Sequence, residues 1–396
     1  MKPLEFIGLS ACTMALTALG IDIMLPAFGE LRTHFGLSAD SAAPAQIISF
    51  FFMGQVAQIV FGVLSDRYGR IPILRVGFPL YIVGGLAAAF APNITILLAA
   101  RFVAGMGSSA LLTTTFAGVR DRFVGDEMAK TMSMIFTIFL FTPVVAPFLG
   151  MAILKVASWQ MVFLTPPLFS VFVFLWSLRL KESLPVDQRV KISWVNIVRS
   201  VKKVVSNKTF VRYAVISTML FAALSSYVAS SEYIVGNIYG KPDWFPWIFA
   251  GVGLLMSVCS FINSRFSSKF GARRSIKALL IAYGMISLVL FVFTILSPNP
   301  PQMLTFFIAV AFLMSINIAV EPNSSALALE PMGDIAGMAS SVYGTLFFFI
   351  GAWMGSVISE LTTRGVLPLV ISFFILGLLA VILVFSERRT VAAAAS

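Results

Sequence analysis

Apolar segments long enough to span a lipid bilayer recur along this whole chain, and they limit the folds that it can adopt. Of the 396 residues, 59% are hydrophobic and only 11% are charged, which is far from the average for soluble globular proteins. A soluble protein could not remove so much apolar surface from water, whereas a helix needs about 20 apolar residues to cross a bilayer. The composition therefore indicates a membrane protein with many spans.

We count twelve candidate spans and expect each to be an α-helix, because a helix closes its backbone hydrogen bonds internally, as hydrocarbon requires. A long polar stretch over residues 181–208 divides the spans into two sets of six. We therefore predict an all-α membrane protein with an N-terminal bundle (1–180), a cytoplasmic linker (181–209) and a C-terminal bundle (210–396). The expected spans are 4–28, 45–64, 73–91, 94–119, 129–153, 160–180, 210–235, 244–266, 275–296, 302–322, 335–358 and 367–385.

Lysine and arginine residues lie almost entirely on one side of these spans. Only Arg32, Lys155, Lys241 and Arg364 fall in loops on the other side, and Arg101 lies inside a span. Because short loops rich in Lys and Arg stay in the cytoplasm, we expect an inner (plasma) membrane protein with both termini cytoplasmic. The net charge of +11 then reflects topology, and nucleic acid is not an expected partner.

A weak internal repeat supports two related halves. The turn GVLSDRYGRIP (62–72) follows the second span, and RFSSKFGARR (265–274) follows the eighth. Gly69 matches Gly271, while Ser268 stands where the first copy has Asp66. Parallel repeats of this kind give pseudo-symmetric bundles related along the membrane normal, with a site near the midplane.

Two ionisable residues lie inside predicted spans at matching depth. At about 1.5 Å per residue, Asp22 and Arg101 both lie roughly 10 Å below the outer surface, where a charge costs about 2.5–3.5 kcal/mol and usually faces a cavity or a partner. If transport changes their distance, the acid can take up and release a proton, so we assign both residues to proton coupling. The alternative is a permanent salt bridge between spans one and four, which would leave Asp22 no coupling role.

Polar residues of the second half are candidates for substrate binding. Glu232 lies near the outer end of span seven with Tyr227 further in, and Glu321 lies near the inner end of span ten with Asn317 one turn deeper. Facing a central cavity, they would contact a cationic or hydroxylated substrate. For both glutamates, a place at the water interface is the alternative.

The sequence indicates neither an enzyme nor a bound cofactor. Cys12 and Cys259 both fall in apolar stretches, so we expect no disulfide framework and no metal site. The HExxH, G-x-S-x-G and P-loop motifs are all missing from the sequence. With no ATP site, energy for transport would have to come from a gradient.

Several motifs together resemble one family of transporters. The turn at 62–72 follows the pattern G-x-L-x-D-R-x-G-R-x-P found between spans two and three of major facilitator superfamily transporters. IDIMLPAF (21–28), RFVAGMGSSA (101–110) and VAPFLG (145–150) are similar to motifs of twelve-span drug/proton antiporters. VRDRF (119–123), SWQMVF (158–163) and PNSSALALEPMGDIAGMASS (322–341) look like the Bcr/CflA group.

This resemblance implies the major facilitator fold and assigns roles to individual residues. It matches Asp22 to the protonatable acid of span one and Arg101 to the arginine associated with proton coupling in span four. It also implies that the turn latches the two halves, with Asp66 facing the start of span eleven, where a carboxylate near a helix N-terminus gains roughly 0.3–1 kcal/mol. The turn residues concerned are Gly62, Asp66, Arg67, Gly69 and Arg70.

The resemblance further places Pro147 and Gly150 where span five bends and packs against span eight. Glycine permits close approach of two helices. A gating role and plain helix packing are both open for Gly150.

The sequence thus predicts a proton-coupled secondary transporter that works by alternating access, foremost an exporter (antiporter) of small amphipathic or polar compounds such as drugs. The alternative is a dedicated transporter of one metabolite or metal-chelating molecule, working in either direction. The expected partners are a small-molecule substrate, protons and the lipid bilayer, and we expect a monomer.

Overall fold

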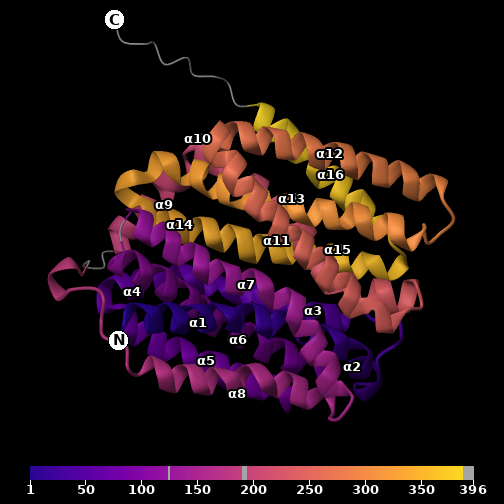
Figure 1. The fold of residues 1–396 in the computed structure, drawn as a ribbon, viewed down its shortest axis with the longest axis horizontal. Helices are drawn as coiled ribbons and strands as arrows, with labels where there is room; N and C mark the ends of the chain where they lie inside the picture. The colour runs from indigo at the N-terminus through magenta and orange to yellow at the C-terminus, as the bar shows by residue number, and fades with distance from the viewer. Residues whose placement is uncertain (124, 190–193, 387–396) are drawn as a thin grey trace, which may run out of the picture.

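The computed structural model describes residues 1–123, 125–189 and 194–386. Within these residues, twelve helical stretches are long and apolar enough to cross a membrane, which confirms the predicted all-α class and the number of spans. Figure 1 shows two neighbouring groups of long helices, one coloured indigo to magenta and the other orange to yellow. We call them the N half (residues 3–177) and the C half (residues 208–385). Parts of the predicted linker (190–193) and of the C-terminal end (387–396) lie outside the described residues.

The N half contains six spans, two of them interrupted by a short 3-10 turn. The first consists of α1 (Pro3–Asp22), η1 (Leu25–Ala27) and α2 (Phe28–His34), and the second of α3 (Ala43–Gly54), η2 (Gln55–Ala57) and α4 (Gln58–Tyr68). The other four are α5 (Arg70–Ala89), α6 (Ile94–Arg122), α7 (Gly125–Leu154) and α8 (Trp159–Ser177).

The C half contains the other six spans. They are α10 (Lys208–Tyr233) with η4 (Ile234–Ile238), η5 (Pro242–Trp244) with α11 (Phe245–Phe270), α12 (Ala272–Leu296), and α13 (Met303–Leu329) with η6 (Glu330–Ile335). The eleventh span runs through α14 (Ala336–Thr345), η7 (Leu346–Ile350), α15 (Gly351–Leu361) and η8 (Thr362–Arg364), and the last is α16 (Leu367–Phe385). Between the halves lie η3 (Val186–Gln188) and α9 (Trp194–Val205).

Two stretches are more helical than the sequence suggested. The first span was expected to end at residue 28, but the chain continues through α2 to His34, because Pro26 lies at the start of η1, where its missing N–H costs nothing. Arg32 therefore lies in a helix instead of a loop. The polar linker contains α9, which packs on α10 and α14 through buried Val204, with Lys202 exposed.

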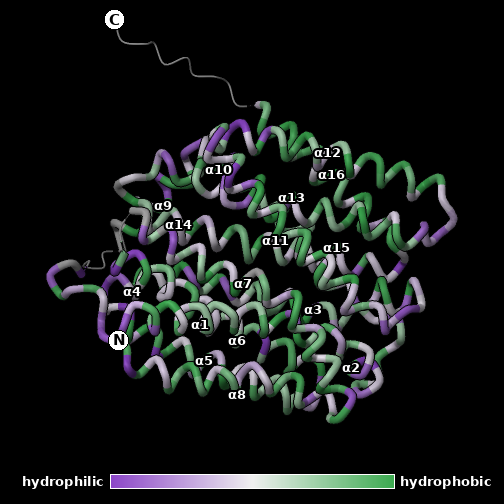
Figure 2. Tube along the Cα trace, viewed as in Figure 1, coloured by the Kyte–Doolittle hydropathy of each residue, from purple (hydrophilic) through white to green (hydrophobic). Residues whose placement is uncertain are grey.

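The molecule has two polar ends and an apolar middle. Figure 2 shows hydrophilic residues gathered toward both ends of the bundle and hydrophobic residues between them. This is the pattern expected of helices that cross a bilayer. We call the end with α9 and the turn between α4 and α5 the inner end, and the end with α2 and η4 the outer end.

The two halves contact each other along two pairs of spans. In one pair, α3 packs on α15 and α4 packs on α14, and α3 also packs on α10 of the seventh span; in the other pair, α7 packs on α11. The 3-10 turn η2 and the π-helix η7 interrupt the first pair at about its midpoint and contact each other. A π-helical turn is a rare irregularity that occurs frequently at functional sites.

Candidate functional site

Asp22 is the last residue of α1, and its side chain is buried with 5% of its surface exposed. In the described residues, no hydrogen-bond donor and no base pairs with its carboxyl group. A buried carboxylate without a partner is costly, and protonation relieves that cost. The position is fitted for a group that binds and releases a proton.

Arg101 lies on α6, and it is the largest fully buried side chain of the described chain, with 1% exposed. Its Nη2 donates to the carbonyl oxygen of Gly20 at 2.5 Å and its Nε to that of Ile47 at 3.5 Å. The guanidinium carbon lies 4.4 Å from the centroid of the Phe51 ring. Backbone carbonyls and an aromatic face of α1 and α3 therefore stabilise the buried charge.

The structure brings Arg101 to α1 but does not pair it with Asp22. The guanidinium binds the backbone at Gly20, two residues before Asp22, and no ion pair joins the two side chains. A permanent salt bridge between spans one and four is therefore not what the structure contains. The coupling role of both residues stays a prediction.

At the inner end, Arg70 joins two acids of the N half. Its Nη1 pairs with Asp66 Oδ1 at 2.5 Å and its Nε with Asp121 Oδ2 at 2.9 Å. Asp121 also accepts a hydrogen bond from Ser183 Oγ at 2.9 Å. Asp121 belongs to the VRDRF sequence, yet nothing in that motif identified it as the partner of the turn.

Glu182, in the predicted linker, caps the N-terminus of α5. Its carboxylate accepts from the N–H groups of Arg70 at 2.9 Å and Ile71 at 3.1 Å, and from its own neighbours Ser183 and Leu184. Burial would raise the pKa of Glu182, but these N–H groups outweigh it and hold the pKa below its ordinary value. Gly69 makes the cap possible, since its φ of 104° suits glycine and a Cβ there would lie 2.5 Å from Glu182 Oε2.

The turn also faces the C half. A Cβ on Gly337, the second residue of α14, would lie 3.8 Å from Asp66 Oδ2, and a Cβ on Gly62 would lie 2.7 Å from Ser341 Oγ. Asp66 thus lies at the start of span eleven, where the resemblance implied that it should. Arg67 is exposed and lies over the ring of Tyr68 at 5.1 Å. Latching by these residues remains a proposal.

At the outer end, Glu232 of α10 is paired with Arg32 of α2. Arg32 Nη1 donates to both carboxylate oxygens at 3.3 and 3.1 Å, and Nη2 donates to Oε2 at 3.1 Å. The side chains are only 7% and 12% exposed, and the Arg32 guanidinium also lies 5.2 Å from the centroid of the Tyr233 ring. Glu232 is therefore neither a free group in a cavity nor a simple interface residue in this structure.

The structure does not gather the other substrate-binding candidates into one place. Tyr227 is 2% exposed and its ring stacks on that of Phe249 at 6.4 Å within the C half. Asn317 is 4% exposed and lies beside Tyr283 of α12. Glu321 is further toward the inner end of α13 and makes no ion pair with a described residue. Their substrate contacts stay predictions.

Gly150 and Pro147 lie in α7, but the contact of Gly150 is not the expected one. A Cβ on Gly150 would clash with the carbonyl oxygen of Ile23, so this glycine fits α7 against α1, next to Asp22. The contact between α7 and α11 is made by other residues, among them Phe148 and Trp247, with ring centroids 4.9 Å apart. Span five thus packs on span eight, as α7 on α11, but the atoms nearest to Gly150 belong to Ile23 and Pro26, because residues 146 and 150 face a different side of α7 from residues 144 and 148. The gating role of Pro147 and Gly150 stays a prediction.

The sequence prediction missed an aromatic contact between the halves at the level of η2 and η7. The ring of Phe52 on α3 lies 5.0 Å from that of Phe221 on α10 and 6.1 Å from that of Phe348 in η7. Phe347 adds a further contact to Phe221 at 4.3 Å. A signal was available, because the pattern FFF-x-G occurs at 50–54 and again at 347–351.

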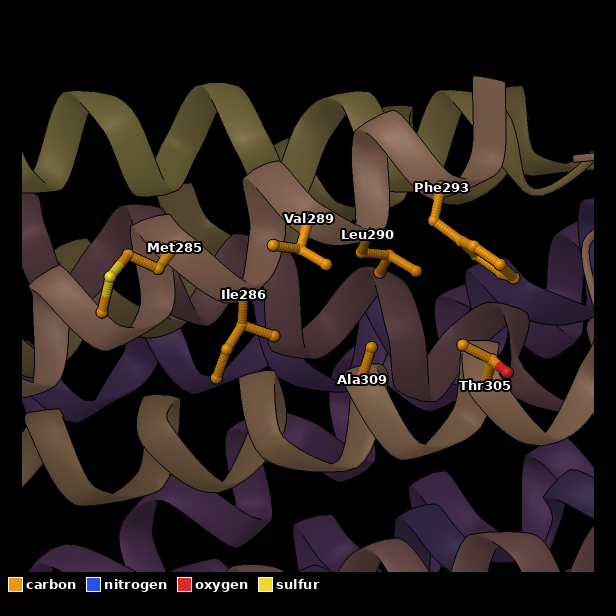
Figure 3. Close-up of a pocket in the computed structure, with 7 residues that line it drawn as sticks. All are labelled: Met285, Ile286, Val289, Leu290, Phe293, Thr305 and Ala309. Carbon is orange, nitrogen blue, oxygen red and sulfur yellow. The ribbon is translucent and has the colours of Figure 1, made fainter. Parts of the chain in front are cut away.

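A groove on the outside of the C half has a different character. It lies between α12 and α13, has a volume of about 270 Å³ and is lined by apolar side chains and Thr305 (Figure 3). Met285 and Val289 at its edge are 58% and 67% exposed. Such apolar exposure is ordinary for a surface that faces lipid, and we assign this groove no role in transport.

Comparison with known proteins shows similarity over almost the whole chain. A family model described as Major Facilitator Superfamily matches residues 10–356. An uncharacterized MFS-type transporter, YdgK of Bacillus subtilis, is 30% identical over 356 residues, which cover 89% of this chain and 87% of that protein. The bicyclomycin resistance protein homolog of Haemophilus influenzae is 29% identical over 379 residues (94% and 92%). A crystal structure of a D-xylose-proton symporter superposes with a TM-score of 0.77 at 12% identity, over 98% of each chain.

Proposed function

The chain belongs to the major facilitator superfamily, and from this premise we propose that it is a proton-driven exporter of small amphipathic or polar compounds, drugs among them. It is a multi-pass membrane transporter of a small-molecule substrate and not an enzyme. Export is supported by the similarity to a bicyclomycin resistance protein homolog. Proton coupling is supported by the geometry at Asp22.

The observation that carries proton coupling is the isolation of the Asp22 carboxyl group. It is buried and has no partner among the residues that the structure describes, while the nearby guanidinium of Arg101 is held by backbone carbonyls at Gly20 and Ile47. A rearrangement of α1 that brings the carboxyl group to Arg101 would stabilise its charged form, and withdrawal would favour its protonated form. This exchange links proton binding to the conformation of the N half.

We infer that transport proceeds by movement of residues 1–180 against residues 210–396, with 181–209 as the linker. The contacts between the halves, from Asp66 and α14 at the inner end to Arg32 and Glu232 at the outer end, would break alternately. The positive-inside rule favours an inner membrane protein with both termini in the cytoplasm. A single chain supplies both halves, so we propose that the monomer suffices.

The test is transport in proteoliposomes under an imposed pH gradient, with a panel that contains neutral, cationic and zwitterionic compounds. We expect the accumulation of at least one panel member inside the proteoliposomes to depend on the pH gradient and to vanish in Asp22→Asn. Gradient-independent transport would overturn proton coupling. If the protein transports one metabolite and none of the drugs in the panel, the proposed function changes from a drug exporter to a dedicated transporter.

A further inference from the structure

Gln55 of η2 is a fully buried glutamine. It begins η2, it is 0% exposed, and neither its Nε2 nor its Oε1 has a hydrogen-bond partner among the described residues. A glutamine amide offers two donated hydrogens and an acceptor oxygen. Buried polar groups are nearly always hydrogen-bonded, so an amide left free on both atoms points to a ligand that is bound only during part of the working cycle.

The neighbours of Gln55 on its own helix place it on the surface that faces the C half. Phe52, three residues earlier, contacts Phe221 and Phe348 of the C half. Gln58, three residues later, lies against α14, since a Cβ on Gly344 would be 2.6 Å from its Oε1. Residues three apart share one helix face, and η2 contacts η7 and α14 of the C half as well as α6 of its own half, so we place Gln55 at the edge of the interface between the halves.

The facing surface of the C half offers aromatic rings and another free polar atom. Thr345, next to Gly344, has a buried hydroxyl oxygen without a partner among the described residues. The rings of Phe347 and Phe348 lie 4.3 and 5.3 Å from that of Phe221 and are only partly buried. The site therefore combines hydrogen-bonding groups with an aromatic wall, and none of its side chains carries a charge.

We propose that Gln55 is the hydrogen-bonding residue of a substrate subsite between η2 and η7. The subsite takes an uncharged molecule that carries an aromatic ring and an amide or hydroxyl group. The rings of Phe52 and Phe348, which stack on each other in this structure, separate to hold the aromatic part, and the Gln55 amide and the Thr345 hydroxyl bind the polar part. This inference rests on the proposed function, because it names the substrate class of the central site of a transporter.

The test is equilibrium binding to the purified full-length protein in lipid nanodiscs with two probes. Chloramphenicol is neutral and carries an aromatic ring, an amide and hydroxyl groups; tetraphenylphosphonium is aromatic and cationic and cannot form hydrogen bonds. We expect the wild-type protein to bind chloramphenicol, and Gln55→Leu to weaken this binding about tenfold, the effect of one lost neutral hydrogen bond. Any binding of tetraphenylphosphonium should change less than twofold.

Two further variants make the result specific. Gln160→Leu on α8 also removes a buried amide oxygen without a partner, but it lies away from the other half and should leave both affinities unchanged. Thr345→Val removes only a hydroxyl group, keeps the side-chain shape and should weaken chloramphenicol binding in the same direction as Gln55→Leu.

The inference and the proposed function can fail separately. The subsite would be overturned if Gln55→Leu weakened the binding of both probes equally, or if neither Gln55→Leu nor Thr345→Val weakened chloramphenicol binding. A structural water would then be the partner of Gln55. Failure of the wild-type protein to bind chloramphenicol would overturn the substrate class. In each case proton-driven transport of another compound in proteoliposomes would leave the proposed function standing.

Discussion

Arg32 of α2 and Glu232 of α10 form a nearly buried ion pair that joins the two halves at the outer end, with Nη1 and Oε2 3.1 Å apart. None of the other ion pairs found among the described residues joins the N half to the C half. A hydrogen bond from Asn237 Nδ2 to the carbonyl oxygen of Ala39, at 3.2 Å, lies beside it. Opening toward the outside must break this contact, so it contributes to the cost of that step.

The first prediction concerns this ion pair. Arg32→Ala should leave Glu232 buried without its partner, at a cost of up to about 3–5 kcal/mol, and should therefore favour the state that is open to the outside. The measurement is labelling of an introduced Ser356→Cys, a half-buried residue of α15 that contacts Gln46 of α3, by a membrane-impermeant maleimide, in a background in which Cys12 and Cys259 are replaced by serine.

The charge swap Arg32→Glu with Glu232→Arg is the control for that experiment. It keeps the attraction and should return the labelling rate toward the wild-type value. If the single and the double variants label equally fast, the ion pair does not hold the outer end closed.

The second prediction concerns Asp22. Asp22→Asn should abolish accumulation driven by a pH gradient, because asparagine cannot exchange a proton, and it should not lower the thermal unfolding temperature, because the carboxyl group has no described partner to lose. Counterflow of substrate without a gradient should persist. Intact gradient-driven accumulation by this variant would exclude the residue from coupling.

The third prediction compares two glycines at helix contacts. Gly150→Ala forces a methyl group against the carbonyl oxygen of Ile23, which is backbone and cannot move aside, so we expect a loss of about 1–3 kcal/mol. Gly253→Ala on α11 is the matched change, because its Cβ would lie at an ordinary 3.6 Å from Pro143. Thermal unfolding in detergent should separate the two, and similar unfolding temperatures would contradict the packing of α7 on α1.

The fourth prediction is a pH dependence at the cap of α5. The pKa of Glu182 is lower in the folded protein than the ordinary 4.5, so its stabilisation is complete above about pH 4.5 and is lost as the pH falls through the folded value. The difference in unfolding temperature between the wild type and Glu182→Gln should therefore shrink on acidification from pH 6 to pH 3.

The sequence predicted the number of spans and the depth of Asp22 and Arg101, because hydropathy and spacing along a helix are local properties. It could not predict which way each side chain turns about its helix axis. Arg101 accordingly binds the carbonyl oxygen at Gly20 and not the carboxyl group two residues further on. Depth alone suggested a pair that the structure does not contain.

The sequence also did not predict contacts between residues that lie far apart along the chain. Glu232 was considered by itself, and Arg32 was assigned to a loop because the first span was expected to end at residue 28. The partners are 200 positions apart, and only the packing of α2 beside α10 brings them together. Gln55 was overlooked for a similar reason, since a buried amide is notable only once its missing partners are known.

The linker is anchored to both halves, and this bounds how far the molecule can open. Glu182 accepts hydrogen bonds from the first N–H groups of α5 and from Leu184, while α9, which begins at Trp194, rests on α10 and α14. A chain of that length extends at most about 35 Å. The segment between Leu184 and Trp194 therefore limits how far the two halves can separate at the inner end. Any wider separation must first break the hydrogen bonds of Glu182 at α5 or remove α9 from α10 and α14.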